Sequence, residues 1–187
     1  LVDNTAPVTT HHIGSPYYAA GGVNYITTAT PISFTAADPV SGEVASGVSK
    51  IEVSLDGALF VAYSSALKFN EGRHTVKYRA IDKVGNVEAE RIIEVQSDNT
   101  APVSTWSAAS GDRIERGNKF YLNALGRIAF ESTDPVINEV ASGVEGIYYG
   151  TDAVPTDKYV TPFGLAEGVR TIKFSAKDNV GNTEVVK

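Results

Sequence analysis

The chain has 187 residues, of which 42% are hydrophobic and 20% are charged, with 16 Lys and Arg against 22 Asp and Glu. This balance is typical of globular domains and excludes a disordered chain, while the formal charge of −6 argues against nucleic acid as a partner. No apolar run approaches the roughly 20 residues that span a bilayer, and without cysteine no disulfide framework can form.

Apolar and polar residues alternate along several short stretches of the first half, which is the pattern of half-buried strands. Ile51, Val53 and Leu55 would share the inward face of one strand, with Glu52 and Ser54 on the other face. No window shows a helical stripe, so we expect no helix longer than about one or two turns. In chain order, the expected strands span residues 6–12, 31–38, 48–55, 73–81 and 87–95, with further short strands inside 59–70 and an extended connection that contains YYAAGGVNY.

The second half repeats the first. DNTAPVTT, which starts at Asp3, returns as DNTAPVST, which starts at Asp98. EGRHTVKYRAIDKVGNVE, from Glu71, returns as EGVRTIKFSAKDNVGNTE, from Glu167. An offset of 95 to 96 residues is too long for a solenoid repeat of roughly 20–50 residues and fits a small self-sufficient domain.

Seven or so short strands in each copy favour an all-β fold of two tandem immunoglobulin-like antiparallel β-sandwiches. The two domains would span residues 1–97 and 98–187. Copy two ends before the counterpart of IIEVQS, which occupies residues 92–97 of copy one, so we expect its last strand to be truncated. The chain would then be a fragment of a longer array.

The repeated motifs resemble the immunoglobulin-like repeats of bacterial and archaeal surface and secreted proteins. The motifs are DNTAPVT, then D…SGV…DG, then EG-x-x-T-(V/I)-x-(Y/F)-x-A-x-D-x-VGN-(V/T)-E. A weaker similarity is to cadherin-like repeats, whose linkers contain a DNxP-like element. The resemblance implies an extracellular or cell-surface location, with neighbouring repeats of the same chain and a surface glycan or protein as partners.

Oxygen-bearing side chains are expected to gather at one pole of each sandwich, where the start of the first strand meets two loops. Such a cluster suits Ca²⁺, which takes about six to eight oxygen ligands. The alternative is that these residues form turns, since the stretch from Asp82 to Asn86 is typical of a hairpin turn with Gly85 at positive φ. The candidate ligands are Asp3, Asn4, Asp38, Glu43 and Asp82 in copy one, and Asp98, Asn99, Asp134, Glu139 and Asp178 in copy two.

Histidine and aromatic residues supply weaker candidates. His11 and His12 could bind a transition metal, but neighbouring strand residues point to opposite faces and copy two has Trp106 at the place of one of them. Exposed aromatic rings could stack on sugars. Tyr149 aligns with the inward Val53, so we expect it in the core. The aromatic set considered is Tyr17, Tyr18, Trp106, Tyr148 and Tyr149.

The sequence contains no nucleophile elbow, HExxH, P-loop or GxGxxG motif, so we expect no enzyme and no catalytic residue. The favoured function is a non-catalytic extracellular spacer or adhesion-stalk module. The alternatives are a carbohydrate- or protein-binding module and an accessory domain of a secreted multidomain hydrolase. A binding site should lie where the copies differ most, which is 11–24 against 107–120 and 56–68 against 152–164.

Overall fold

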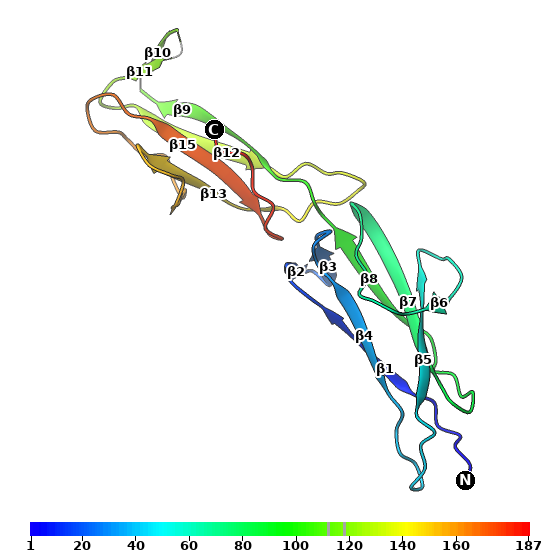
Figure 1. The fold of residues 1–187 in the computed structure, drawn as a ribbon. Helices are drawn as coiled ribbons and strands as arrows, with labels where there is room; N and C mark the ends of the chain where they lie inside the picture. Colours follow the sequence, from blue (N-terminus) through cyan, green and yellow to red (C-terminus); the bar gives the residue numbers. More distant parts are fainter. Residues whose placement is uncertain (112, 118) are drawn as a thin grey trace. The chain divides into compact units, whose positions relative to one another are not determined.

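The computed structural model describes residues 1–111, 113–117 and 119–187, and all of its regular elements are β-strands (Figure 1). No helix occurs among these residues, as the period-two alternation predicted, and none there could therefore cross a membrane. The chain divides into two compact units. Unit 1 comprises Leu1–Asn99 with Ile137–Val140, and unit 2 comprises Thr100–Val136 with Ala141–Lys187. The domain limits 1–97 and 98–187 stay a prediction beside this division.

Unit 1 is a two-layer sandwich of eight strands. β1 pairs with β4, and the other six strands form one sheet in the order β2-β3-β8-β7-β5-β6. Both layers supply one apolar core, in which Phe34 of β4 is 5% exposed and Val76 of β7 is fully buried. The strands are β1 (Val8–Ile13), β2 (Tyr17–Ala20), β3 (Val23–Ile26), β4 (Ile32–Ala37), β5 (Val48–Leu55), β6 (Val61–Ala62), β7 (Gly72–Asp82) and β8 (Arg91–Ser97).

The connection YYAAGGVNY is more regular than the sequence predicted. It forms the hairpin β2–β3, whose second strand pairs in parallel with β8. Gly21 and Gly22 both adopt positive φ, 57° and 80°, which is the backbone that a two-residue hairpin turn needs. By contrast, the region 59–70 forms only the two-residue strand β6. The strand predicted at 48–55 matches β5 at both ends.

The outer face of β5 corrects the simple inward–outward prediction for that strand. Glu52 and Ser54 were expected to face solvent, yet they are 9% and 3% exposed. The Glu52 carboxylate is paired with Lys50 at 2.6 Å and with Arg79 at 2.9 Å, and the Arg79 guanidinium lies 4.1 Å from the ring centre of Phe60. The loop after β5 therefore covers this face, and the buried charge has the partners that burial requires.

Unit 2 contains the remaining seven strands. β9 pairs with β12, β10 pairs with β11, and β13 lies between β14 and β15. Phe130, Ile147 and Phe174 form its core, and Tyr149 packs against them with its ring stacked 4.4 Å from Phe163, which confirms the inward placement of Tyr149. The strands are β9 (Val103–Ser110), β10 (Arg113–Arg116), β11 (Lys119–Leu122), β12 (Arg127–Thr133), β13 (Val144–Thr151), β14 (Asp157–Lys158) and β15 (Ile172–Asp178).

Candidate functional site

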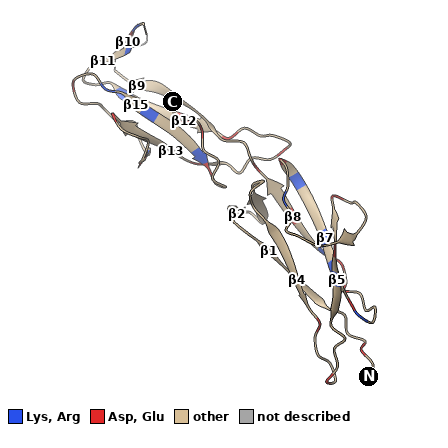
Figure 2. Cartoon of the chain, in the orientation of Figure 1, with Lys and Arg blue, Asp and Glu red and all other residues tan. Residues whose placement is uncertain are grey.

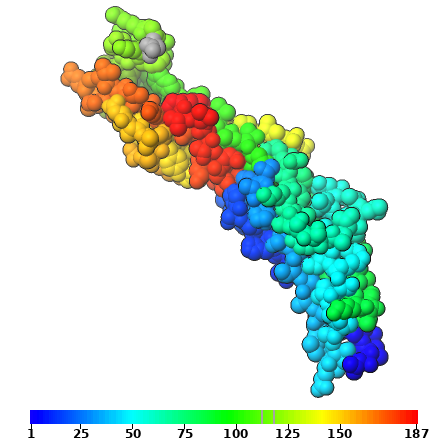
Figure 3. Space-filling model, viewed as in Figure 1, coloured from blue at the N-terminus to red at the C-terminus, as the bar shows by residue number. Residues whose placement is uncertain are grey.

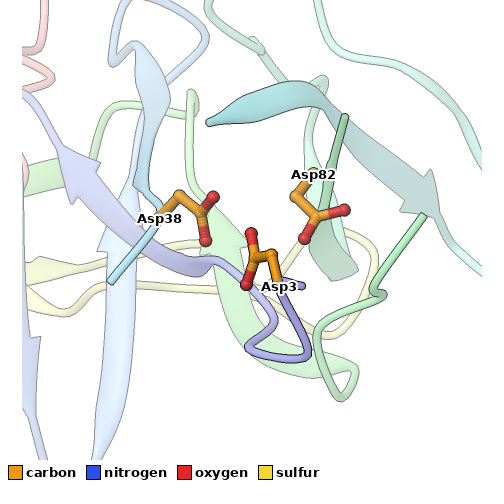
Figure 4. A group of neighbouring side chains, drawn as sticks. All are labelled: Asp3, Asp38 and Asp82. Carbon is orange, nitrogen blue, oxygen red and sulfur yellow. The ribbon is translucent and has the colours of Figure 1, made fainter. Parts of the chain in front are cut away.

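Three carboxylates of unit 1 converge at one end of the sandwich. Asp3 precedes β1, Asp38 follows β4, and Asp82 ends β7. Each offers an oxygen within 4.8 Å of an oxygen of the other two, and Figure 4 shows the three side chains turned toward one another. In Figure 3 the blue N-terminal residues lie beside the cyan connection that follows β4, at the same end of the unit. The sequence prediction that these three residues meet is thus matched by their positions.

Asp82 organises the turn that follows β7. Its Oδ1 accepts the backbone N–H groups of Val84, Gly85 and Asn86 at 3.0, 2.7 and 2.8 Å, and its Oδ2 accepts the Asn86 side-chain amide at 2.6 Å. Burial raises the pKa of Asp82, but these hydrogen bonds outweigh burial and hold the pKa below its ordinary 3.8. Asp82 is therefore ionised at neutral pH, and its role as a turn former is established by geometry.

Asp3 and Asp38 bind the loop that leads into β5. Asp3 accepts N–H groups from Thr5 at 3.1 Å and Ser46 at 2.6 Å, and these hydrogen bonds lower its pKa although the Asp82 charge opposes them. Asp38 Oδ2 accepts the Gly47 N–H at 2.6 Å. Its Oδ1 is buried and has no hydrogen-bond partner among the described residues. A buried carboxylate oxygen without a donor is costly, and a cation between the three carboxylates would supply the missing partner.

Other predicted ligands of copy one lie outside this trio. Glu43 is exposed in the tight turn between Ser41 and Val44, where it adopts a φ of 64°. Asn4 is also exposed. The Asn86 amide nitrogen donates to the backbone oxygen of Asp3 at 3.0 Å, so this side chain links the turn to the N-terminal segment.

The predicted ligands of copy two divide between the units. Asp98 and Asn99 close unit 1: the Asp98 N–H donates to the Ile26 carbonyl at 2.9 Å, and Asn99 Oδ1 accepts the Thr28 N–H at 2.6 Å. Glu139 is exposed, at a φ of 64°, and belongs to the segment 137–140 of unit 1. In unit 2, carboxylate oxygens of Asp134 and Asp178 come within 4.8 Å of each other.

The Asp178 turn of unit 2 repeats the Asp82 turn of unit 1. Asp178 Oδ1 accepts the N–H groups of Val180, Gly181 and Asn182 at 3.0, 2.6 and 2.8 Å. Its Oδ2 accepts the Asn182 side-chain amide at 2.6 Å. Asp134 Oδ2 accepts the Gly143 N–H at 2.7 Å, in the same way that Asp38 Oδ2 accepts the Gly47 N–H.

Two buried glutamates form links that the sequence analysis did not single out. Glu88 lies after the Asp82 turn and is 7% exposed; its carboxylate accepts the Thr9 N–H of β1 at 2.9 Å and the Ala80 N–H of β7 at 3.0 Å. The Thr9 hydroxyl also donates to it, and Arg91 neutralises it at 2.8 Å. The glutamate thus ties the first strand of one layer to the central strand of the other. In the sequence, this link could have been found from the recurrence of the same glutamate in copy two, as Glu184.

Glu184 makes the corresponding link in unit 2. It accepts the Ser104 N–H of β9 at 3.0 Å and the Ala176 N–H of β15 at 3.2 Å, and it also binds the Ser104 hydroxyl and the Lys187 ammonium. Burial raises the pKa of Glu184, but these donors outweigh burial and hold the pKa below its ordinary 4.5. Both copies therefore fasten their first strand with a largely buried carboxylate.

The remaining candidates are exposed or partly buried. His11 Nδ1 lies 2.9 Å from the Tyr78 hydroxyl, and burial lowers its pKa. Trp106 packs edge-on against Phe120 at 4.6 Å between ring centres, with the Arg113 guanidinium 4.8 Å from the Phe120 ring centre. Tyr17, Tyr18 and Tyr148 lie in strands, and the Tyr148 hydroxyl donates to Glu145 at 2.8 Å, which raises the pKa of the phenol.

The basic residues visible in Figure 2 lie on separate segments of the described chain, for example on β7 and β15. Two surface hollows have volumes of about 180 Å³, beside Arg73 and Gln96, and about 130 Å³, beside Val103 and Glu131. Pockets for small organic ligands usually measure about 300–1,000 Å³, so neither hollow has the size of such a pocket.

No family model and no curated protein matches the chain. One solved structure with which it shares a likeness is described as "Structures of Clostridium thermocellum CbhA fibronectin(III)-like modules". The superposition has a TM-score of 0.48 at 16% sequence identity and covers 95% of this chain and 90% of that chain. A likeness at this level carries no assignment of family or function.

Proposed function

We propose that this chain is a non-catalytic structural module, a spacer or adhesion stalk of an extracellular repeat protein. The observation that supports the proposal is the glutamate link present in both units. A stalk transmits force through its chain ends, so the first strand of each unit must not peel from the sandwich. Glu88 and Glu184 oppose peeling because each binds that strand to the opposite layer with charge-assisted hydrogen bonds in a largely buried setting.

Single-molecule force spectroscopy on the whole chain tests the stalk. We expect two unfolding events, with the force of one lowered by Glu88→Ala and the force of the other lowered by Glu184→Ala. Glu90→Ala is the matched control, because Glu90 is exposed and forms a surface ion pair with Lys77 at 3.4 Å. Unfolding forces that stay unchanged in both Ala variants would remove the support for a mechanical role.

We also propose that the trio of Asp3, Asp38 and Asp82 binds Ca²⁺. Three carboxylates held within 4.8 Å repel one another when ionised, and the buried Asp38 Oδ1 has no donor among the described residues. A calcium ion would offset both costs, with Asp3, Asp38 and Asp82 as its protein ligands. The bound ion would join the chain start to the loops after β4 and β7.

Calorimetric titration of the metal-stripped chain with CaCl₂ tests this part of the proposal. We expect binding heat and a rise in melting temperature at millimolar Ca²⁺, both reduced by Asp38→Asn. Glu43→Gln is the matched control, since Glu43 lies outside the trio. No heat and no thermal shift would leave the three aspartates as turn formers.

A carbohydrate- or protein-binding module is the second candidate function. It is favoured by the aromatic cluster of unit 2, where Phe120 and Tyr121 are 41% and 54% exposed beside Trp106. Phe120 belongs to the range 107–120, one of those where the two copies differ most, as a receptor site should. Titration of soluble polysaccharides against Trp106 fluorescence, with Phe120→Ala for comparison, distinguishes the two functions: saturable binding that Phe120→Ala abolishes would favour the binding module.

A further inference from the structure

Unit 1 has an edge strand with one side open. β6 is the last strand in the order β2-β3-β8-β7-β5-β6 and pairs with β5 alone. The Tyr63 N–H donates to the Ile51 carbonyl at 2.8 Å, so the backbone groups of Tyr63 and of Val61 face β5. Those of Phe60 and Ala62 therefore point away from β5, to a side where no described strand pairs with them (Figure 1).

The side chains along this edge are apolar and exposed. Leu59 is 89% exposed and Val61 is 59% exposed. The stretch from Gly57 to Leu67 contains neither a charged residue nor a proline, and β6 pairs with β5 without a register shift. Natural proteins protect an edge strand with charges, proline or a bulge, because an unprotected edge pairs with other strands. β6 has none of these protections.

The corresponding strand of unit 2 keeps the backbone and changes the side chains. The Tyr159 N–H donates to the Ile147 carbonyl at 2.8 Å, which matches the bond that holds β6 to β5. This strand, β14, consists of Asp157–Lys158, and Pro155 precedes it. The same edge is therefore protected in one copy and open in the other, within one of the regions where the copies differ most.

The other edge strands of unit 1 are less suited to accept a strand. β2 is preceded by Pro16, which has no N–H group, and its exposed Tyr17 donates its hydroxyl to Asn24 at 2.8 Å. β1 already uses the Thr9 N–H to bind Glu88 at 2.9 Å. β6 is therefore the edge of this unit at which a further strand meets the least obstruction.

We propose that β6 pairs with β6 of a second copy of the chain, antiparallel about a two-fold axis at Val61. In this register Val61 lies opposite the partner's Val61, and Leu59 lies opposite the partner's Tyr63. Phe60 of each copy exchanges backbone hydrogen bonds with Ala62 of the other, so the groups that β5 leaves unpaired find partners. Apolar side chains that lie directly opposite each other across two strands stabilise the pair.

The side chains of the edge favour a second copy as the occupant. A two-fold axis brings each side chain on it against itself, and like charges directly opposite each other are destabilising. Val61 meets no such penalty, whereas Asp157 of β14 would face a second aspartate. About five residues of each copy take part, against the roughly 20–30 a side of a standard interface, so we expect a weak dimer that forms at high concentration. The pairing goes beyond the spacer function because it joins separate chains.

Sedimentation velocity of the whole chain over a range of concentrations tests the pairing. We expect a monomer that converts to a dimer as concentration rises, with slower amide exchange at Phe60 and Ala62 in the dimer. Val61→Lys should weaken the dimer at least about tenfold, because it sets two ammonium groups across the axis. Val40→Lys is the matched control, since Val40 is 73% exposed in the loop between β4 and β5, and this variant should dimerise as the parent does.

An equimolar mixture of the Val61→Lys and Val61→Asp variants tests the register. The axis would set the ammonium group of one variant opposite the carboxylate of the other, so the mixture should dimerise more strongly than either variant alone. Circular dichroism should show that both variants melt as the parent monomer does, because Val61 is exposed.

Three results would overturn the proposal. The first is a monomer at every concentration up to the solubility limit. The second is a dimer that Val61→Lys leaves intact, which would assign the contact to another surface. The third is a mixture of the two variants that dimerises no more strongly than its components, which would exclude a two-fold axis at Val61.

Discussion

The Asp82 and Asp178 turns are nearly identical, whereas the two hairpins β2–β3 and β10–β11 differ. The turns match within 0.1 Å in each of their three backbone hydrogen bonds to the aspartate. β2–β3 joins the main sheet of unit 1 through β8. β10–β11 forms a two-stranded sheet of its own among the described residues. The aspartate's hydrogen bonds to the turn lie within five consecutive residues, while the hairpin of unit 1 pairs with a distant strand.

This difference explains which features both units share. The carboxylate accepts N–H groups that follow it directly in the sequence, so its hydrogen-bond partners are present at both VGN turns of the chain. A hairpin of two strands is marginal by itself and gains stability by joining a larger sheet. We therefore expect the turns to be equally important in both units and the hairpins to be unequal.

The largest expected effect comes from removing the aspartate of a turn. Asp178→Ala leaves the N–H groups of Val180, Gly181 and Asn182 without their acceptor, and we expect unit 2 to lose about 3–5 kcal/mol of unfolding free energy. Urea denaturation followed by Trp106 fluorescence reports unit 2 directly. Lys177→Ala is the control, since Lys177 is exposed.

The corresponding substitution in unit 1 allows the two aspartate turns to be compared. Asp82→Ala should weaken unit 1 as strongly as Asp178→Ala weakens unit 2, which amide exchange in β7 and β5 would measure. A clear inequality between the two would contradict the view that each turn is locally determined.

The strands and turns that the sequence predicted correctly are those that local residue patterns determine. The alternation around Val53 and Tyr78 was sufficient to place β5 and β7, and the repeated VGN motif predicted both aspartate turns. The hairpin β2–β3 was missed as a pair of strands because its second strand pairs in parallel with β8, more than 60 residues away. The burial of Glu52 was missed for a similar reason, since it depends on how the loop with Phe60 folds back.

The sequence also predicted the candidate site only in part, because strand order could be inferred from local patterns and the course of a loop could not. Asp3, Asp38 and Asp82 meet because each follows or precedes a strand whose order the sandwich fixes. Glu43 lies only five residues beyond Asp38, but the tight turn from Ser41 to Val44 directs it away into solvent. Spacing along the chain could not reveal that turn, because it requires positive φ at a glutamate.

A smaller effect is expected from acid. The pKa values of Asp3 and Asp82 in unit 1 and of Glu184 in unit 2 lie below their ordinary values of 3.8, 3.8 and 4.5 in the folded chain. A carboxyl group with a lowered folded pKa stabilises the fold above its unfolded pKa and loses that contribution as pH falls through the folded value. We therefore expect a steady melting temperature from pH 7 to about 5 and a fall in both units below about 4.

Thermal unfolding followed by circular dichroism and by Trp106 fluorescence at pH 7 to 2.5 checks this pH dependence. Asp3→Asn should flatten the acid loss of unit 1 and leave unit 2 unchanged. A melting temperature that rises on acidification would show that repulsion among the carboxylates exceeds the gain from their hydrogen bonds.

The smallest effect, and the sharpest comparison, concerns a glycine at the same place in each hairpin turn, Gly21 and Gly117. Gly21 and Gly117 adopt similar positive φ, 57° and 63°, so alanine introduces similar local strain of about 1 kcal/mol at both places. In unit 1 the strain should appear in the unfolding free energy, because β3 is joined to β8 in the main sheet. In unit 2 it should melt the β10–β11 hairpin locally and change the unfolding free energy by only a few tenths of a kcal/mol.

Urea denaturation of Gly21→Ala and Gly117→Ala measures the two losses, and amide exchange in β11 detects the local melting. Equal losses would show that β10–β11 is coupled to the sandwich of unit 2 after all.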